Sequence, residues 1–169
     1  PVARVVSAYF FCRHDDGRRH DQLCGTDIVD ARTLDLLAFA EHWGNYGIRQ
    51  FLLAFVLPED VLASGVDILT TKYTAVGILE DWETTLLLFN ATLGIPGFDW
   101  PATFGKAGRR NAYRLGQHNR DSIHEDPKVK MLREAWVDPE LRKILWIDIL
   151  FYDHAVEVFN QQVEIHGLR

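Results

Sequence analysis

The sequence contains no apolar run close to the about 20 residues that a membrane-spanning helix requires. Its first residues do not have the pattern of a signal peptide, and it has no internal repeat, no low-complexity segment and only two cysteines. The histidines have no metal-ligand spacing to one another or to the cysteines, so we expect no metal site. It also lacks a Gly-x-Ser-x-Gly motif, a Cys/His nucleophile pattern and a phosphate-binding Gly-Lys-Ser/Thr loop. Nucleophilic catalysis therefore has no support in the sequence.

Basic residues are too few for a typical nucleic-acid-binding domain, because 18 Lys and Arg stand against 24 Asp and Glu and the net charge is -6. They are nevertheless clustered between Asp99 and Asp121, where no acidic residue occurs. This cluster, the basic loop, contains Lys106, Arg109, Arg110 and Arg114 together with Gly105 and Gly108. A cationic loop in an acidic protein suits a small anionic ligand or a segment of a polyanion. The alternative is a solvated surface loop.

With 169 residues, of which 47% are hydrophobic, the chain is long enough for one domain with its own core. Its patterns predict a mostly helical structure with few strands. The expected helices cover residues 1–11, 33–43 ending near Gly44, 49–55, a brief stretch from Pro58 that ends before Gly65, 80–93 ending at Gly94, a start at Asp126-Pro127, and a long closing helix from Asp138-Pro139 to about Ile165. Tyr73 to Leu79 is rich in β-formers and predicts a buried parallel strand, whereas residues 94–119 predict a loop.

The first eleven residues place a cation and a hydroxyl one helical turn apart on an apolar helix. Proline suits the first helical position, and the residues that form the expected buried face are Val2, Val5, Val6, Tyr9 and Phe10. Arg4 and Ser7 stand at positions i and i+3. Such a pair, with the free N–H groups of a helix start, suits a phosphate. The alternative is that both side chains are simply solvated.

The segment Pro1-Val2-Ala3-Arg4-Val5-Val6-Ser7-Ala8-Tyr9 resembles the 3'-phosphate-binding segment of sulfotransferases that use 3'-phosphoadenosine 5'-phosphosulfate (PAPS), commonly written Arg-Asp-Pro-x-x-Arg-x-x-Ser-x-Tyr. Lys72 to Leu86 is similar to the strand, acidic turn and helix of Golgi carbohydrate sulfotransferases, in particular the heparan sulfate 2-O-sulfotransferase group. Leu150 to Phe159 resembles the closing helix of that group. The leading Arg-Asp pair of the motif would precede Pro1, so the chain is expected to start inside the motif.

The resemblance implies an α/β, P-loop-like sulfotransferase fold that is incomplete here, helix-rich and with few parallel strands. Residues 1–169 would be the C-terminal part of a single sulfotransferase domain. The implied activity is transfer of a sulfuryl group from PAPS to a hydroxyl, of a glycan in the first instance, with no nucleic-acid partner. The implied location is the Golgi lumen, in a type II membrane protein whose anchor lies outside this chain. The family's 5'-phosphosulfate loop and its catalytic His would also lie upstream, so the catalytic residues here are unknown, and the acceptor is not specified.

Candidate binding residues follow from the resemblance and from composition. Ser7 carries over as a 3'-phosphate ligand, whereas Arg4 matches the motif but can instead brace the helix through a salt bridge. The basic loop resembles the family's late nucleotide loop, so the remaining expected cofactor ligands, with Arg110 and Lys106 as first choices, are Lys106, Arg109, Arg110 and Arg114. A polar stretch of the kind that lines sugar clefts supplies the expected acceptor contacts, which are His42, Asn45, Arg49 and Gln50. Trp43 and Tyr46 in the same stretch are expected in the core.

Cys12 and Cys24 bracket a polar, charged segment. A disulfide that closed this loop would stabilise the protein by about 3 kcal/mol on the loop-entropy model, and two reduced thiols are the alternative. The implied Golgi setting favours the disulfide. Asn90-Ala91-Thr92 has the pattern of an N-glycosylation site, which is consistent with the same setting.

A function of a different class is also compatible with the sequence. The chain would then be a noncatalytic helical module that binds an anionic polymer through the basic loop. A kinase of the same fold is a third option, which we disfavour because a 3'-phosphate motif has no use with ATP. Binding of adenosine 3',5'-bisphosphate at Ser7 distinguishes the enzyme from the module, since the module would bind sulfated polymer and ignore the nucleotide.

Overall fold

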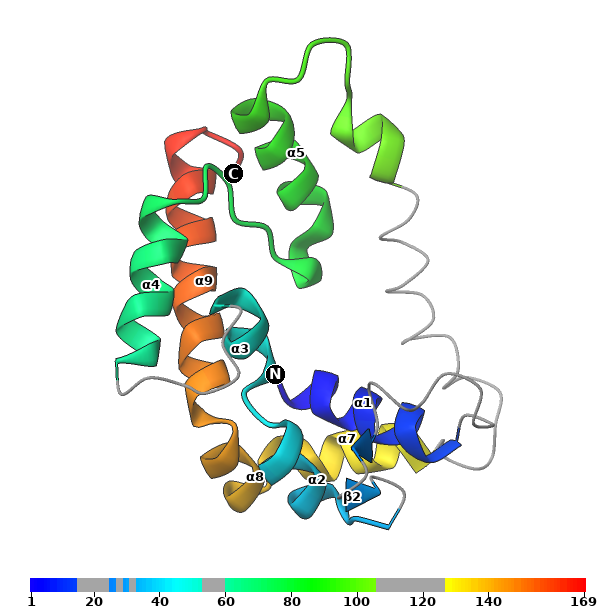
Figure 1. The fold of residues 1–169 in the computed structure, drawn as a ribbon. Helices are drawn as coiled ribbons and strands as arrows, with labels where there is room; N and C mark the ends of the chain where they lie inside the picture. Colours follow the sequence, from blue (N-terminus) through cyan, green and yellow to red (C-terminus); the bar gives the residue numbers. More distant parts are fainter. Residues whose placement is uncertain (15–24, 27–28, 31–32, 53–59, 106–126) are drawn as a thin grey trace. The chain divides into compact units, whose positions relative to one another are not determined.

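A computed structural model of the chain describes residues 1–14, 25–26, 29–30, 33–52, 60–105 and 127–169. Helices make up most of these residues, as Figure 1 shows. The chain divides into two compact units, each formed by two stretches that are distant in sequence. Unit 1 contains Pro1–Leu57 and His124–Ile149, and unit 2 contains Pro58–Ile123 and Leu150–Arg169. The expectation that both belong to one sulfotransferase domain stays a prediction.

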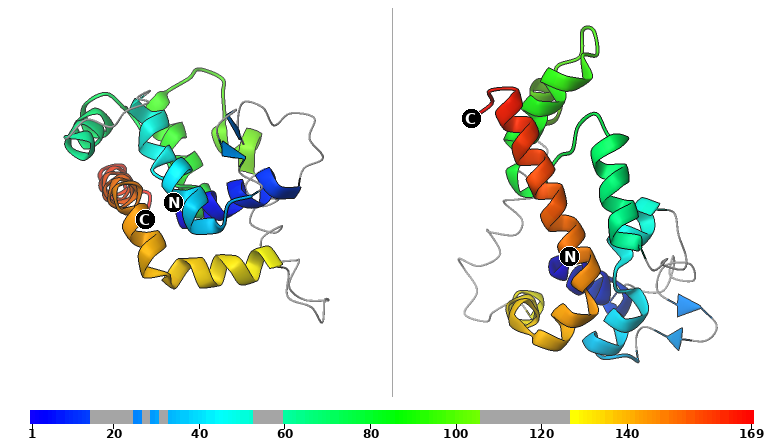
Figure 2. Two further views of the ribbon diagram at one scale, coloured as in Figure 1. Left: turned by 60° about the horizontal axis from the view of Figure 1, so that its bottom comes forward. Right: turned by 90° about the vertical axis from the view of Figure 1, so that its left-hand side faces the viewer.

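Unit 1 is built from short helices. They are α1 (Val2–His14), α2 (Leu36–Trp43), α3 (Tyr46–Leu52), α7 (Pro127–Val137), α8 (Pro139–Ile144) and the start of α9 (Trp146–Ile165). Helix α1 contacts α7 and α2, and α2 contacts α8. Figure 2 shows α1 (blue) and α7 (yellow) from two further sides. A two-residue antiparallel pair joins β1 (Gly25–Thr26) to β2 (Val29–Asp30).

The buried face predicted for α1 is confirmed. Val2, Val5, Val6 and Tyr9 are buried in the core of unit 1, and Phe10 packs against that core while only partly buried. Cys12 of α1 also belongs to this core, and its other members come from α2, α7, α8 and the residue that follows α8, and are Phe39, Ala40, Ala135, Leu141 and Leu145. Burial of a large apolar side chain contributes about 1.5 to 3 kcal/mol, so this core fixes α1 firmly. Arg4 and Ser7 lie on the exposed side of α1.

The boundaries of α2 follow from its two ends. The carboxylate of Asp35 accepts a hydrogen bond of 2.8 Å from the Ala38 N–H, so the helix begins later than the predicted residue 33. Its predicted end at Gly44 is confirmed. A Cβ atom at Gly44 would clash with the carbonyl oxygen of Ala40, so only glycine fits there. Helix α3 begins at Tyr46, three residues before the predicted start at Arg49.

Unit 2 contains α4 (Val61–Thr71), the 3-10 turn η1 (Leu79–Asp81), α5 (Trp82–Leu93), a helical segment at residues 100–105, and α9 from Leu150 onward. The predicted end of α4 before Gly65 is wrong, because the helix continues through this buried glycine. The predicted end of α5 is confirmed, since Gly94 has the left-handed φ of 53° that favours glycine. The core of this unit contains Ile78, Leu88, Phe159 and Val163.

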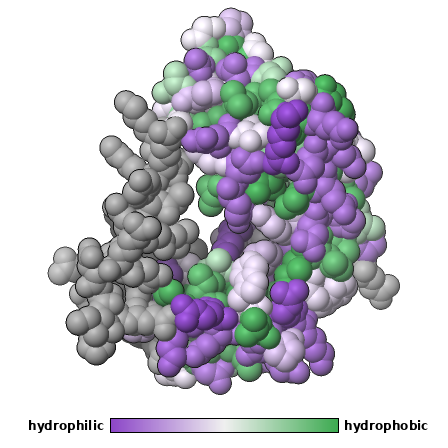
Figure 3. All heavy atoms as spheres, turned by 180° about the vertical axis from the view of Figure 1, so that it is seen from behind, coloured by the Kyte–Doolittle hydropathy of each residue, from purple (hydrophilic) through white to green (hydrophobic). Residues whose placement is uncertain are grey.

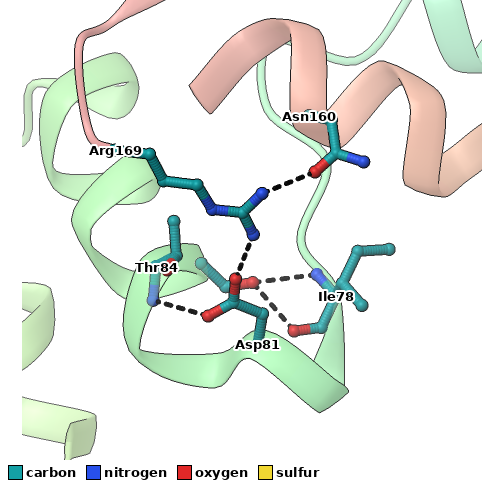
Figure 4. Close-up of polar contacts among 6 residues, drawn as sticks. Ile78, Asp81, Thr84, Asn160 and Arg169 are labelled. Atoms are coloured by element: carbon teal, nitrogen blue, oxygen red, sulfur yellow. Dashed lines mark hydrogen bonds and ion pairs between the residues drawn. The ribbon is translucent and has the colours of Figure 1, made fainter. Parts of the chain in front are cut away.

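The prediction of a parallel strand from Tyr73 to Leu79 is wrong. Residues 73–78 form no strand, and side chains rather than a neighbouring strand bond several of their backbone groups. The Gln162 amide accepts from the Val76 N–H at 2.9 Å and donates to the Thr74 carbonyl at 3.3 Å. The Thr85 hydroxyl accepts from the Ile78 N–H at 2.8 Å and donates to the Ile78 carbonyl at 2.9 Å. Dashed lines mark both bonds at the labelled Ile78 in Figure 4. The strands in the described residues are only the antiparallel β1 and β2, so the helix-rich part of the fold prediction is confirmed and the parallel sheet is not found among them.

The two predicted helix starts in the last third of the chain are confirmed. Helix α7 begins at Pro127, and Asp138 caps α8 by accepting from the Glu140 and Leu141 N–H groups at 2.9 and 3.1 Å. The prediction of a single long closing helix is wrong, however, because α8 ends at Ile144 and α9 begins at Trp146. At this break between the two helices, the Ile144 carbonyl accepts a hydrogen bond from the Asn45 side chain.

Apolar side chains also lie at the surface of unit 2. Leu93, Ile95, Phe98 and Phe104 are each more than a third exposed. Figure 3 shows apolar residues (green) at the surface among polar ones (purple). Among the residues that the structure describes, no helix has both the length and the apolar character needed to cross a membrane.

Candidate functional site

The candidate site is a cavity of about 350 Å³ in unit 1. Arg4 and Ser7 of α1 both line it, so the structure brings the two residues of the motif to one cavity. Three aromatic rings form much of the remaining wall, and they belong to Phe39, Trp43 and Tyr46. Volumes of about 300 to 1,000 Å³ with mainly apolar walls and a few polar groups are typical of small-molecule sites.

Arg4 contacts an aromatic ring of the same cavity. Its guanidinium carbon lies 4.7 Å from the centroid of the Tyr46 ring, which is the geometry of a cation–π interaction. Such a contact contributes about 0.5 to 2 kcal/mol, depending on how far it is desolvated. Arg4 therefore braces α1 against α3 through a ring. Tyr46 and Trp43 are half-buried wall residues rather than fully buried core residues.

Ser7 is bonded to a residue that the sequence did not indicate. The ammonium group of Lys128, in the first turn of α7, donates to the Ser7 hydroxyl oxygen at 3.1 Å. A lysine ammonium can only donate, so the hydroxyl keeps its own hydrogen for an acceptor. The two residues are 121 positions apart, and no local pattern links them.

The wall formed by the α2–α3 turn is held by a carboxylate from α9. Asp148 is 6% exposed and accepts from the Gly47 and Ile48 N–H groups at 3.0 and 2.8 Å, so it caps α3. A Cβ atom at Gly47 would lie 3.1 Å from both carboxylate oxygens, which leaves little room for any other residue. Asp148 also lines the cavity.

Asn45 completes this arrangement, which we call the Asn45–Asp148 clamp. Its amide oxygen accepts from the Asp148 N–H, and its amide nitrogen donates to the Ile144 carbonyl, both at 3.0 Å. Its φ of 54° lies in the left-handed region, which asparagine tolerates better than most residues. The side chain predicted to contact an acceptor thus has a structural role in the fold of unit 1.

Comparisons with protein-family models, with curated proteins and with solved structures find no match to this chain. The function is therefore inferred from the residues of the cavity.

Three other predicted site residues, His42, Arg49 and Gln50, do not line the cavity. His42 and Gln50 are exposed on α2 and α3. Arg49 of α3 is half-buried, and its Nε atom has no hydrogen-bond partner among the residues that the structure describes. The basic-loop residues Lys106, Arg109, Arg110 and Arg114 lie outside the described residues. Within the described residues no group of His, Cys, Asp and Glu side chains could hold a metal ion.

Cys12 adds a covalent constraint to the cavity wall. Its side chain is buried and disulfide-bonded, and it lines the cavity near Ser7 of the same helix. Cys24, with which it is predicted to pair, lies outside the described residues. The predicted glycosylation residue Asn90 is exposed on α5, where its amide oxygen accepts from the Trp100 N–H at 3.4 Å.

A second polar cluster lies in unit 2 and is shown in Figure 4. Asp81 caps α5 by accepting from the Thr84 N–H, and the Arg169 guanidinium binds both Asp81 and the Asn160 side chain. Hydrogen bonding from Thr84, opposed by partial burial and reinforced by Arg169, lowers the pKa of Asp81. Nearby, partial burial and the hydrogen bond to Glu80 raise the pKa of Tyr152. These contacts join the last residues of the sequence to η1 and α5.

Proposed function

We propose that the protein is a PAPS-dependent sulfotransferase and that the cavity of unit 1 binds the adenosine 3',5'-bisphosphate part of the cofactor. The observation that carries the proposal is that Arg4 and Ser7, the cation and the hydroxyl of the resembled motif, line one cavity with Trp43 and Tyr46. Neither helical spacing nor composition requires that these four side chains share a cavity. The acceptor would be a hydroxyl, of a glycan in the first instance.

The chemistry of the cavity fits the two parts of such a nucleotide. The aromatic and aliphatic walls suit a purine ring, because flat apolar surfaces stack well against a heterocycle. Ser7 at the wall has a hydroxyl hydrogen to donate, and hydrogen bonds to a charged phosphate are stronger than those between neutral groups. Arg4 and Lys128 add positive charge beside that hydroxyl, in an otherwise acidic protein.

The transfer step itself makes further demands. A sulfuryl group that moves from the anhydride to a hydroxyl needs in-line positioning, donors on its oxygens and a base that takes the acceptor proton. The described residues would hold the nucleotide, and the base is not assigned. The P-loop-like α/β fold is part of the proposal and needs a parallel sheet from outside the described residues. The basic loop would close over the nucleotide, with Arg110 and Lys106 as its first contacts.

The cellular setting is also a proposal. Disulfides persist in oxidising compartments and are rare in the cytosol. The disulfide at Cys12 therefore supports a secretory protein and is compatible with the Golgi lumen.

Calorimetry with adenosine 3',5'-bisphosphate tests the proposal. The wild-type protein should bind this ligand more tightly than adenosine 5'-phosphate, which lacks only the 3'-phosphate. Ser7→Ala should weaken binding of the bisphosphate by about 1.5 to 3 kcal/mol and leave the 5'-phosphate unchanged.

Two results would contradict the proposal. One is the absence of any nucleotide binding by the wild-type protein. The other is salt-sensitive binding of a sulfated polymer that Ser7→Ala does not alter and that the nucleotide does not compete with, since this is the behaviour of the helical module.

A further inference from the structure

Two contacts of α1 indicate which residue supplies the cation of the phosphate site. Arg4 stands in the position of the motif's cation, but its guanidinium lies over the Tyr46 ring at 4.7 Å. Lys128 stands in no recognised motif, but its ammonium lies 3.1 Å from the Ser7 hydroxyl oxygen. The hydroxyl and the ammonium are therefore already side by side, whereas Arg4 is engaged by a ring.

We propose that Lys128 is the residue that, together with Ser7, holds a phosphate monoester at the mouth of the cavity, and that Arg4 instead positions the Tyr46 wall. The identity of the ligand as a nucleotide rests on the proposed function. The phosphate site itself rests on the pair Ser7 and Lys128.

The donor chemistry of the pair supports this assignment. The ammonium has three hydrogens, and one of them is directed to the Ser7 oxygen. The Ser7 hydroxyl can direct its hydrogen to an oxygen that also accepts from the ammonium. Lysine binds phosphate well as a compact point charge, and a phosphate oxygen can accept several hydrogen bonds at once.

Arg4 serves the same cavity in another way. Its contact with Tyr46 joins α1 to the first residue of α3, and Tyr46 follows directly on the Asn45–Asp148 clamp. Loss of Arg4 should therefore disturb the wall that faces the base of the ligand. Loss of Lys128 should weaken the site of the phosphate.

The helix α7 offers a matched control. Lys130 lies two residues further along α7, is exposed, and faces Glu134 at 3.9 Å rather than α1. Lys128→Gln and Lys130→Gln each remove one positive charge from the same helix. A difference between them measures the local contact and not the net charge.

Calorimetry on the full chain, with the two adenosine nucleotides, tests the inference. Lys128→Gln should lower the affinity for adenosine 3',5'-bisphosphate by about tenfold or more, and leave the affinity for adenosine 5'-phosphate unchanged. Lys130→Gln should bind all ligands as the wild-type protein does. Arg4→Ala should weaken both nucleotides by a similar factor, because both share the adenosine part.

The outcomes separate this inference from the proposed function. If the wild-type protein binds the bisphosphate and Lys128→Gln binds it equally well, the inference is overturned and the proposed function stands. An equal loss for both nucleotides in Lys128→Gln also overturns it. If no nucleotide binds but inorganic phosphate shifts the amide resonances of Ser7 and Lys128 in the wild-type protein and not in Lys128→Gln, the phosphate site is supported and the proposed function fails. If neither nucleotides nor phosphate bind, both are overturned.

Discussion

Removal of the Asp148 carboxylate should destabilise unit 1 strongly. Asp148→Ala leaves the Gly47 and Ile48 N–H groups at the start of α3 without the acceptor that they have at 3.0 and 2.8 Å. A hydrogen bond to a charged group contributes about 1.5 to 3 kcal/mol, and loss of a helix cap costs about 0.5 to 2 kcal/mol. Because Asp148 lines a cavity that water can enter, part of this loss is recovered by hydration. We expect a net loss of about 2 to 4 kcal/mol in the free energy of unfolding.

Urea denaturation gives the global loss, and hydrogen exchange at the Gly47 and Ile48 amides gives the local one. Both amides should exchange faster in Asp148→Ala, while amides in α5 of unit 2 should not. Asp153→Ala is the control, because Asp153 is an exposed carboxylate on the same helix and should change stability by less than about 0.5 kcal/mol. Unchanged exchange at Gly47 and Ile48, or an equal loss of stability in both variants, would refute the reasoning.

Two further predictions concern unit 2. Thr85→Val keeps the shape of the side chain but leaves the buried Ile78 N–H without its acceptor, while the Ile78 carbonyl keeps the Asp81 N–H as a donor at 3.2 Å. We therefore expect a loss of about 1 to 3 kcal/mol in urea denaturation, against a small effect for Thr92→Val, whose hydroxyl donates to the Leu88 carbonyl of its own helix. A loss no larger than that of Thr92→Val would contradict this account. The pKa of Asp81 is lowered from its ordinary value of 3.8, so this residue stabilises the fold above that pH, and the contribution is lost as the pH falls through the lowered pKa. Arg169→Ala should move the pKa of Asp81 upward in an NMR titration of the carboxyl carbon, and an unmoved titration would show that Arg169 has no influence on it.

Features that depend on neighbouring residues could be predicted from the sequence. The end of α2 at Gly44, the end of α5 at Gly94 and the starts of α7 and α8 all follow from local caps or from proline. The prediction of a strand at residues 73–79 was wrong because Thr85 and Gln162 bond backbone groups of this segment. No local pattern reveals that these two side chains have this role.

The residues of the candidate site divide in the same way, into those that a local pattern reveals and those that only the tertiary fold brings together. Arg4 and Ser7 could be found because they belong to one helix and one motif. Lys128 and Asp148 could not, because each contacts residues about 100 or more positions away in the sequence. Asn45 was recognised as a notable polar residue, but its bonds to α8 and α9 depend on the tertiary fold.

The Asn45–Asp148 clamp has a consequence for how the protein is made. Its two halves are separated by 103 positions, and unit 1 resumes at His124 only after most of unit 2 has been synthesised. Contacts of such sequence separation form late, because the loop between them must first be closed. On the ribosome, residues 1–52 would therefore leave the exit tunnel with the apolar face of α1 covered only in part, by α2, until α7 and α8 follow. At about 5 to 20 residues per second this interval lasts several seconds, during which a chaperone or the Cys12 disulfide would be the main protection of α1 against aggregation.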